Sequence, residues 1–474
     1  MKPPASTGGH PHGPKDGRAQ GPGQGRHHGP HRDAAETWSR DAIEAFQLDT
    51  LREQLRRVGN DSVYYRKLFN DSGFDALDLK SLDDLARLPV TRKTDYVATI
   101  TPGNPFGEFM CAPQSEVRRM HFSSGTTAAP SPQFWSARDL DRWSDLYARN
   151  AHAQGVREGD IFQCMFTYTW FVGGLGATAG YQKAGALVIP AGSQDTERQI
   201  ATMMTYGTTA FCATPSFALH LAEEVSKRGM DPASSPVRTI MVGGEPGASV
   251  HATRARIEQA WGARCFDAYG CLEFQPIAAE CEAQRGLHLA EDFAYAEVVD
   301  AETGEAVANG QPGVLVLTHL DKEAGPLVRW WTGDVVVRDQ TTCVCGRTHA
   351  RLLGGVIGRA DDMLVVRGVN VFPSAIEELV RTQPDLTDEY RIVLDDSVRD
   401  AAGFLKSIRL QVEASNPEHV GALLAQRIRE RLGVHASVDV LKPGTLERST
   451  HKARRVNLLK LFTEWSLKLE RQRD

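Results

Sequence analysis

Hydrophobic residues in the middle of the chain come in short apolar runs, separated by segments with helical spacing. Each run is short and apolar enough for a buried strand. Residues 216–229 instead repeat apolar side chains at i, i+3 and i+4, which predicts an amphipathic helix ending at Gly229. Strands that alternate with helices predict an α/β domain with largely parallel pairing. The apolar runs are residues 161–166, 186–190, 209–213 and 238–244.

The pattern changes toward the C-terminus. Residues 313–320 and 334–342 resemble antiparallel strands, and beyond residues 358–373 the order of elements is typical of a small α+β domain. We therefore expect three parts: a tail over residues 1–34, a large domain over 35–360 and a small domain over 361–474. The elements expected in the small domain are a helix at 375–382, strands at 389–396 and 407–414, a helix at 417–433, a strand at 436–444 and a charged terminal helix.

The composition is that of an ordinary globular protein. The chain has 474 residues, 41% of them hydrophobic and 24% charged, with a formal net charge of −6. A net negative charge argues against nucleic-acid binding. The sequence contains neither an apolar run long enough to span a membrane nor a secretory signal, so we expect a cytoplasmic protein.

The first residues have a different composition. Residues 1–33 contain 8 Gly, 6 Pro and 5 His, and too few apolar side chains to offset the entropy lost on ordering. Order is expected to begin with the helical pattern of residues 35–58. The histidines could hold a metal weakly, but a solvated tail is the favoured interpretation.

The stretch HFSSGTTAAPSPQFW, residues 121–135, contains candidate phosphate-binding groups. Its hydroxyls and closely spaced backbone N–H donors suit phosphate oxygens, although it lacks the lysine of a GxxxxGK[ST] loop. A cluster of this kind is more often a simple turn. Companion motifs follow in order: GGEP at 243–246, DAYGCLE at 267–273, RWWTGD at 329–334, GRADD at 358–362 and LERSTHKARRV at 446–456.

In this order the motifs resemble the adenylate-forming superfamily of acyl-CoA synthetases. The runs GGLGATAGYQKAG, GLHLAEDFAYAEVVD, GVLVLTHLDKEAGPLVRW and GRADDMLVVRGVNVFPSAIEE are similar to the phenylacetate–CoA ligase family within it. The resemblance covers about residues 40–460. It implies an α/β fold with a large adenylate-forming domain and a small mobile C-terminal domain. It also implies ATP-dependent activation of a carboxylic acid as an acyl-adenylate, followed by thioester formation with coenzyme A and release of AMP and pyrophosphate.

The resemblance implies a role for each motif. Asp334 matches the ribose-binding aspartate, Arg359 an arginine near the same sugar, and Glu273 a glutamate associated with Mg²⁺, which spreads charge on the leaving pyrophosphate. The phosphate cradle comprises Ser123, Ser124, Gly125, Thr126 and Thr127, with Thr126 also counted as catalytic. The remaining nucleotide-binding set comprises Gly244, Glu245, Pro246, Asp267, Ala268, Tyr269 and Gly270.

Two implied roles fall on the small domain. Lys452 matches the catalytic lysine that bridges the carboxylate and the α-phosphate, and so supplies a cation that the phosphate loop lacks. His451 stands where relatives usually have glycine, which can change how Lys452 reaches the site. Asp361 matches the hinge about which the small domain rotates. From the residues alone, a solvated surface lysine would be the favoured interpretation of Lys452. An ordinary turn aspartate would be as acceptable as a hinge for Asp361.

Four cysteine and histidine residues form a candidate metal set. Cys281, His288, Cys343 and Cys345 would make a closed Cys₃His zinc site, hence a structural one, and some relatives carry a similar arrangement. Free buried cysteines are the alternative. His349 is a substitute ligand should His288 point away.

The aromatic stretch MFTYTWFVGGLG, residues 165–176, is the candidate acyl pocket. Tyr168, Trp170, Phe171 and Gly174 would suit a flat aryl or arylacetic acid, and plain core packing is the alternative.

Two further functions stay open at this stage. The activated acid could pass to a carrier-protein thiol, an amine or another small nucleophile, or the Cys/His residues could mark a non-enzymatic metal-handling or scaffold protein. The expected partners are ATP, coenzyme A and an aromatic acid, without nucleic acid or membrane, and a homodimer is compatible with the sequence.

Overall fold

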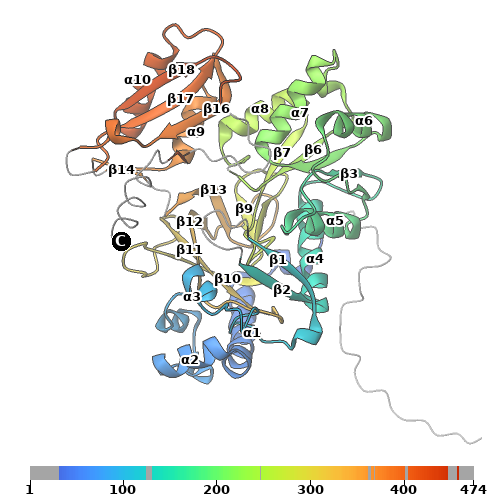
Figure 1. Ribbon diagram of the computed structural model, residues 1–474. Coiled ribbons are helices and arrows are strands. Elements are labelled where there is room, and N and C mark those ends of the chain that lie inside the picture. Colours follow the sequence, from blue (N-terminus) through green and yellow to red (C-terminus); the bar gives the residue numbers. More distant parts are fainter. Residues whose placement is uncertain are drawn as a thin grey trace, which may run out of the picture.

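The computed structural model describes residues 31–123, 131–245, 247–360, 364–367, 369–400, 404–446 and 456–457. An eleven-stranded mixed sheet forms the frame of the larger part (Figure 1). One half of it pairs in parallel in the order β4-β3-β5-β6-β7, as the alternating apolar runs predict. These strands are β3 (Ile161–Cys164), β4 (Leu187–Ile189), β5 (Ala210–Ala213), β6 (Thr239–Val242) and β7 (Arg264–Tyr269).

The other half of the sheet is antiparallel and runs β7-β8-β9-β13-β12-β11-β10. The antiparallel pairing predicted for residues 313–320 and 334–342 is confirmed, although the second strand begins earlier, at Trp330. The strands are β8 (Ala278–Glu280), β9 (Leu287–Leu289), β10 (Ala294–Val299), β11 (Pro312–His319), β12 (Trp330–Asp339) and β13 (Arg351–Arg359).

A separate antiparallel hairpin carries the phosphate-loop motif. Its strands are β1 (Val117–Phe122) and β2 (Pro132–Ser136), and His121 lies opposite Gln133. Helix α4 (Ala137–Ala153) follows β2 directly, because Ser136 and Asp139 form a capping box at its first turn. The hairpin is thereby attached to a long helix of the larger part.

The remaining helices of the larger part follow the predicted pattern. The amphipathic helix is α7, which begins after the capping residue Thr214 and ends just before Gly229, a residue with φ of +74°. The α-helices are α1 (Arg40–Asp61), α2 (Val63–Ser72), α3 (Lys93–Ala98), α5 (Gly173–Lys183), α6 (Thr196–Tyr206), α7 (Pro215–Lys227) and α8 (His251–Trp261). The short 3-10 turns are η1 (Ala34–Thr37), η2 (Ala76–Asp78), η3 (Leu82–Arg87), η4 (Gln114–Glu116) and η5 (Pro232–Ser234).

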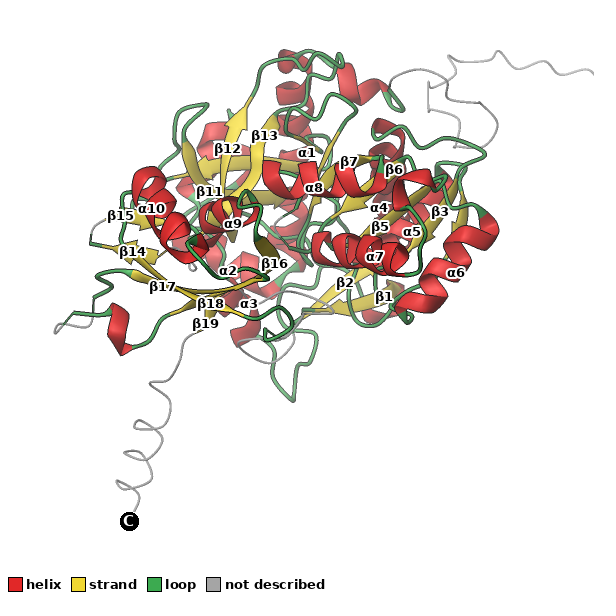
Figure 2. Ribbon diagram, turned by 90° about the horizontal axis from the view of Figure 1, so that it is seen from above, coloured by secondary structure: helices red, strands yellow, loops and turns green. Residues whose placement is uncertain are grey.

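The C-terminal part has its own four-stranded sheet, β18-β17-β16-β19, covered by two helices (Figure 2). Its buried apolar residues, from Leu364 to Val434, form a cluster separate from those of the larger part. The predicted terminal helix lies outside the described residues. The elements are β14 (Leu364–Val366), β15 (Val369–Val371), α9 (Pro373–Arg381), β16 (Leu386–Val393), η6 (Asp396–Val398), β17 (Ile408–Ala414), α10 (Val420–Leu432), β18 (Ala436–Leu441) and β19 (Val456–Asn457).

Within the described part of the chain, no helix is both long and apolar enough to cross a membrane.

Candidate active site

The GGEP motif follows β6 at the carboxyl end of the parallel strands. A Cβ atom on Gly243 would lie 2.9 Å from the Ala268 carbonyl oxygen, so only glycine lets these two backbones approach so closely. Gly244 has φ of +90°, which also favours glycine. Glu245 accepts a hydrogen bond from the Ser216 backbone N–H at 2.8 Å, which fastens this turn to the first residues of α7. Pro246 lies outside the described residues.

Two of the predicted site residues, Tyr269 and Arg359, bond to a third, Asp334. The Tyr269 hydroxyl donates to its Oδ2 at 2.5 Å, and Arg359 Nη1 donates to its Oδ1 at 2.8 Å. Tyr269 ends β7, whereas Asp334 and Arg359 lie opposite each other on β12 and β13. Burial and the Asp334 charge together raise the pKa of Tyr269 well above its usual value, so its hydroxyl stays a donor.

Asp267 is buried beneath the GGEP turn. Its Oδ2 accepts the Ser249 backbone N–H at 3.0 Å, and a Cβ on Gly247 would lie 2.7 Å from its Oδ1. Burial, followed by the charge of Glu280, raises the pKa of Asp267 to about 7. These contacts make Asp267 a support for the turn. Ala268 lies between Asp267 and Tyr269 on the same strand, and the backbone of Gly270 lies against the Gln275 side chain.

Ser123 ties the two ends of the phosphate-loop segment together. Its backbone N–H donates to the Ser131 carbonyl at 3.0 Å, and its hydroxyl accepts the Ser131 N–H at 3.0 Å. The rest of the predicted cradle lies outside the described residues, as do the predicted catalytic lysine and hinge aspartate. These are Ser124, Gly125, Thr126, Thr127, Lys452 and Asp361.

Glu273 lies in the loop after β7 with 8% of its surface exposed. It lines a small cavity together with Trp135 of β2 and Lys322, which follows β11. The Cys271 thiol is a hydrogen-bonding neighbour of the Glu273 carboxylate.

The candidate acyl-pocket residues differ in exposure. Tyr168 is half-buried, and its hydroxyl lies 2.5 Å from Thr178 Oγ1 of α5. Trp170 and Phe171 are 61% and 37% exposed. Gly174, at the start of α5, has no room for a Cβ, which would lie 2.5 Å from the Thr167 carbonyl oxygen. Tyr168 and Gly174 are thus in fixed positions, whereas Trp170 presents its ring at the surface.

The four candidate zinc ligands come together in space. One ligand atom from each of Cys281, His288, Cys343 and Cys345 lies within 4.8 Å of the others. A hydrogen bond from Cys281 lowers the pKa of the Cys345 thiol. Burial opposes protonation of His288, but hydrogen bonds to Cys343 and Cys345 outweigh it and raise the pKa of His288. His349 is not part of this group, since its Nδ1 bonds to the Leu289 carbonyl at 2.9 Å.

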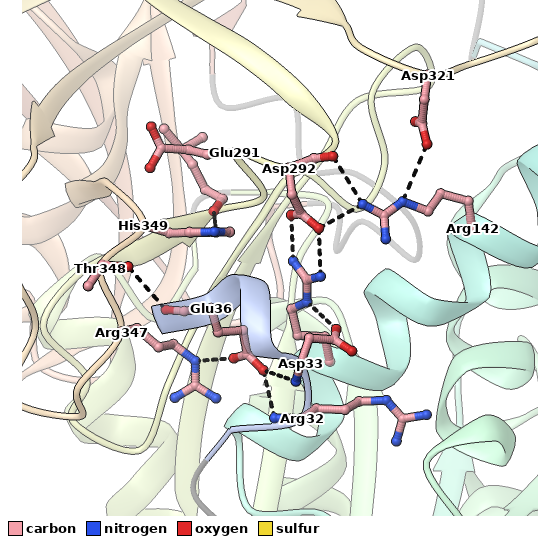
Figure 3. A network of polar contacts seen from close by, with 12 residues as sticks. Arg32, Asp33, Glu36, Arg142, Glu291, Asp292, Asp321, Arg347, Thr348 and His349 are labelled. Atoms are coloured by element: carbon pink, nitrogen blue, oxygen red, sulfur yellow. Dashed lines mark hydrogen bonds and ion pairs between the residues drawn. The ribbon is translucent and has the colours of Figure 1, made fainter. Parts of the chain in front are cut away.

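A chain of ion pairs lies beside the Cys/His group (Figure 3). Asp292 accepts bonds from Arg149 at 2.7 and 2.8 Å and from Arg142 at 2.7 Å, both on α4. Arg149 also donates to Asp33 at 2.8 Å, while Glu36 pairs with Arg347, two residues from Cys345. The network joins the N-terminal segment, α4 and the loops of the sheet.

Comparison with known proteins agrees with this arrangement. Residues 78–319 match the AMP-binding enzyme family, and residues 368–458 match the C-terminal domain of AMP-binding enzymes. The phenylacetate-coenzyme A ligase of Thermus thermophilus is 35% identical over 448 residues, covering 86% of this chain and 98% of the relative. The phenylacetate-coenzyme A ligase of Aromatoleum evansii is 36% identical over 424 residues, covering 86% and 93%.

A solved relative, 2-hydroxyisobutyryl-CoA ligase, is known in more than one state. In complex with 2-HIB-AMP in the postadenylation state it superimposes with a TM-score of 0.85 at 30% identity, covering 93% of this chain and 94% of that one. With 2-HIB-AMP and CoA in the thioesterification state the TM-score is 0.68 at 31% identity and the same coverage. The arrangement of domains seen here is therefore more similar to the postadenylation state.

The fold and the nucleotide-site motifs are those of an adenylate-forming enzyme. At this identity and coverage, the chain belongs to the phenylacetate–CoA ligase family. It is an AMP-forming acid–CoA ligase, which converts a carboxylic acid and ATP into an acyl-adenylate and then transfers the acyl group to coenzyme A.

Sequence reasoning missed two features of the site. Lys322 lines the same cavity as Glu273 although it is 49 positions further along the chain, and its run GVLVLTHLDKEAGPLVRW indicates only a family resemblance and no role for the lysine. Gly355 of β13 was also missed, although a Cβ there would lie 2.4 Å from Ser249 Oγ. Both contacts exist only because distant segments meet.

Proposed function

We propose that the acid activated by this ligase is a small aromatic carboxylate such as phenylacetate. The observation that carries this proposal is the start of α5. There, a Cβ on Gly173 would lie 3.5 Å from the Phe166 ring, and in the loop after β4 a Cβ on Gly192 would lie 3.0 Å from the Tyr168 ring. Aromatic rings packed on glycine backbone form flat walls, which suit a planar substrate. The phenylacetate-coenzyme A ligases among the relatives support the same substrate class.

We assign the nucleotide to the carboxyl end of the parallel strands. Asp334 would bind the ribose hydroxyls, and its bonds to Tyr269 and Arg359 already hold the carboxylate in one orientation. The backbone of Gly244 and Glu245 next to Ala268 would hold the adenine, with Asp267 as support beneath the turn. The segment that begins at Ser123 would hold the phosphates.

The metal assignments rest on the donor atoms available. Glu273 offers a carboxylate oxygen, the kind of ligand that Mg²⁺ prefers, and bound Mg²⁺ would neutralise charge on the pyrophosphate. The Cys281, His288, Cys343 and Cys345 group offers three sulfur atoms and one nitrogen, which fit a closed structural zinc site. Zinc there would contribute to folding and not to the reaction.

The small C-terminal part would act as a lid. We propose Asp361 as the hinge and Lys452 as the cation that reaches the carboxylate and α-phosphate during adenylation. The motifs GRADD and HKARR in the sequence, together with the match of residues 368–458 to the C-terminal domain of AMP-binding enzymes, support this assignment.

A short branched acid is the second candidate substrate, because 2-hydroxyisobutyryl-CoA ligase shares the fold closely. The deciding experiment measures pyrophosphate release with a panel of aryl, arylacetic and short hydroxy acids, with and without coenzyme A. We expect phenylacetate or a related aromatic acid to give the highest kcat/KM, with full turnover only when coenzyme A is present. A preference for 2-hydroxyisobutyrate over every aromatic acid would reject the aromatic proposal.

A further inference from the structure

A small cavity lies between the phosphate-loop hairpin, α4 and the segment after β11. It leaves about 10 Å³ for the centre of a water molecule, enough for roughly one water. Its walls include both aromatic rings and charged groups: Trp135, Trp143, Glu273, Gln275, His319 and Lys322. Lys322 and the proposed magnesium ligand Glu273 therefore line the same cavity.

The side chain of Lys322 is buried. Only 3% of its surface is exposed, and among the described residues nothing accepts a hydrogen bond from its Nζ. The ammonium lies 4.4 Å from the centre of the Trp135 ring, where the ring face offers a weak cation–π interaction. A buried ammonium without a hydrogen-bonded counter-ion costs several kcal/mol of stability. A methionine would fill a similar volume without this cost, so packing alone does not account for the lysine.

The other cations on the cavity are already paired. Arg142 bonds to Asp292 at 2.7 Å, as Figure 3 shows, and Arg138 bonds to Glu323 at 3.2 Å. Lys322 differs from both, since its positive charge is not used in an ion pair within the described part of the chain.

Two carboxylates act on Lys322 through space. The oxygens of Asp139 are occupied, because they accept the backbone N–H groups of Glu323 at 2.7 Å and Ala324 at 3.0 Å. Glu273 is the other, and it lines the same cavity. Burial lowers the pKa of Lys322 to about 8, and the charges of Asp139 and Glu273 partly oppose this shift. Lys322 is thus protonated at neutral pH and lines the same cavity as Glu273.

We propose that Lys322 is a positioning residue for the adenylation step, whose buried charge weakens the binding of a divalent cation at Glu273. The proposal rests on Glu273 being the magnesium ligand. The lysine offsets one unit of the negative charge that Glu273 and Asp139 bring to this region, so a free cation gains less from the Glu273 carboxylate. The cation then binds well only together with the phosphates of ATP, and it can leave with pyrophosphate.

The test measures Mn²⁺ binding directly, by the electron paramagnetic resonance signal of free Mn²⁺, in the full-length protein without nucleotide. Lys322→Met removes the charge and keeps the length of the side chain, so we expect Mn²⁺ to bind at least about fivefold more tightly. Lys322→Arg keeps the charge and should bind within about twofold of wild type. Lys80→Met, a change of the same type at an exposed site, is the matched control.

The outcomes separate this proposal from the proposed function. Unchanged Mn²⁺ affinity in Lys322→Met, or an equal change in Lys322→Met and Lys322→Arg, would overturn the role of the lysine charge. Lys322→Gln serves as the second neutral variant if the methionine variant does not fold. Glu273→Gln should weaken Mn²⁺ binding, and if it does not, the magnesium assignment itself is wrong.

Discussion

At the scale of single residues, Asp334 connects both halves of the main sheet. Tyr269 belongs to the last strand of the parallel half, whereas Asp334 and Arg359 belong to the antiparallel half. With both oxygens bonded, the carboxylate has little freedom to rotate. A ribose would meet a preorganised group, which lowers the entropy cost of binding.

We expect Asp334→Asn to weaken ATP binding by about 10- to 100-fold, because hydrogen bonds to a charged group contribute about 1.5–3 kcal/mol. Isothermal titration with ATP measures this loss. Tyr269→Phe, which keeps the pair with Arg359, should lose less affinity. A folded Asp334→Asn variant that binds ATP as well as wild type would contradict the ribose assignment.

The burial of Lys322 leads to a second prediction, which concerns the free energy of unfolding. Its folded-state pKa of about 8 is below the ordinary value of 10.5, so the unfolded chain binds the proton more tightly. The stability of the wild type should therefore rise with pH between about 8 and 10.5. Lys322→Met should be more stable at pH 7 by about 2–3 kcal/mol, and its advantage should shrink across this range.

Chemical denaturation at pH 7, 9 and 10 measures this difference. Lys80→Met should show no comparable dependence on pH. A constant difference between Lys322→Met and wild type would mean that the lysine does not lose its proton in this range.

At the scale of elements, Asp292 holds α4 against the loop between β9 and β10. Burial would raise the pKa of its carboxyl, but Arg149 and Arg142 outweigh this and hold the pKa well below its usual range. The stability that Asp292 contributes is present above the unfolded-state pKa and lost as the pH falls below it.

We expect Asp292→Asn to lower the free energy of unfolding by about 3–5 kcal/mol at pH 7, because it removes the main charge partner of the buried Arg149 and of the partly buried Arg142. Asp141→Asn is the control, since Asp141 is 74% exposed in its pair with Lys183 and should contribute at most about 1 kcal/mol. Equal losses in the two variants would contradict the importance assigned to the buried network.

The Cys/His group links the loop after β8 to the loop after β12. Protein lacking residues 1–30 should bind about one zinc per chain, because four ligands close the site and four of the five tail histidines are removed. Elemental analysis measures the ratio. Cys345→Ser should lose the metal and melt at a lower temperature, and zinc-free protein of unchanged melting temperature would favour free buried cysteines instead.

At the scale of the whole molecule, the proposed role of Lys452 would make adenylation depend on charge from both domains. Lys452→Ala should abolish acid-dependent pyrophosphate release while leaving ATP binding largely intact, because the large domain holds the nucleotide and the lysine acts on the reacting groups. Transfer of a ready-made acyl-adenylate to coenzyme A should be affected much less. Normal pyrophosphate release in this variant would reject the role assigned to Lys452.

Local patterns were sufficient for most of the elements. The run of residues 209–213 and the helix of residues 216–229 appear as β5 and α7, shifted by at most two residues at their ends. The pattern predicts a strand over residues 334–342, but β12 begins at Trp330. The motif RWWTGD hides this start, because Trp330 and Trp331 are extended backbone as well as part of the motif.

The order of motifs along the chain determined the family, the two-step reaction and the identity of the residues around Asp334. Such information is local, because each motif needs only a few neighbouring residues of fixed type. Only the tertiary structure decided that Tyr269 and Arg359 share Asp334, that His288 and not His349 joins the cysteines, and that Lys322 and Glu273 line one cavity. These contacts join segments that are far apart in the sequence. Their energies depend on how far water is excluded from them, and that is decided by the packing of the whole chain.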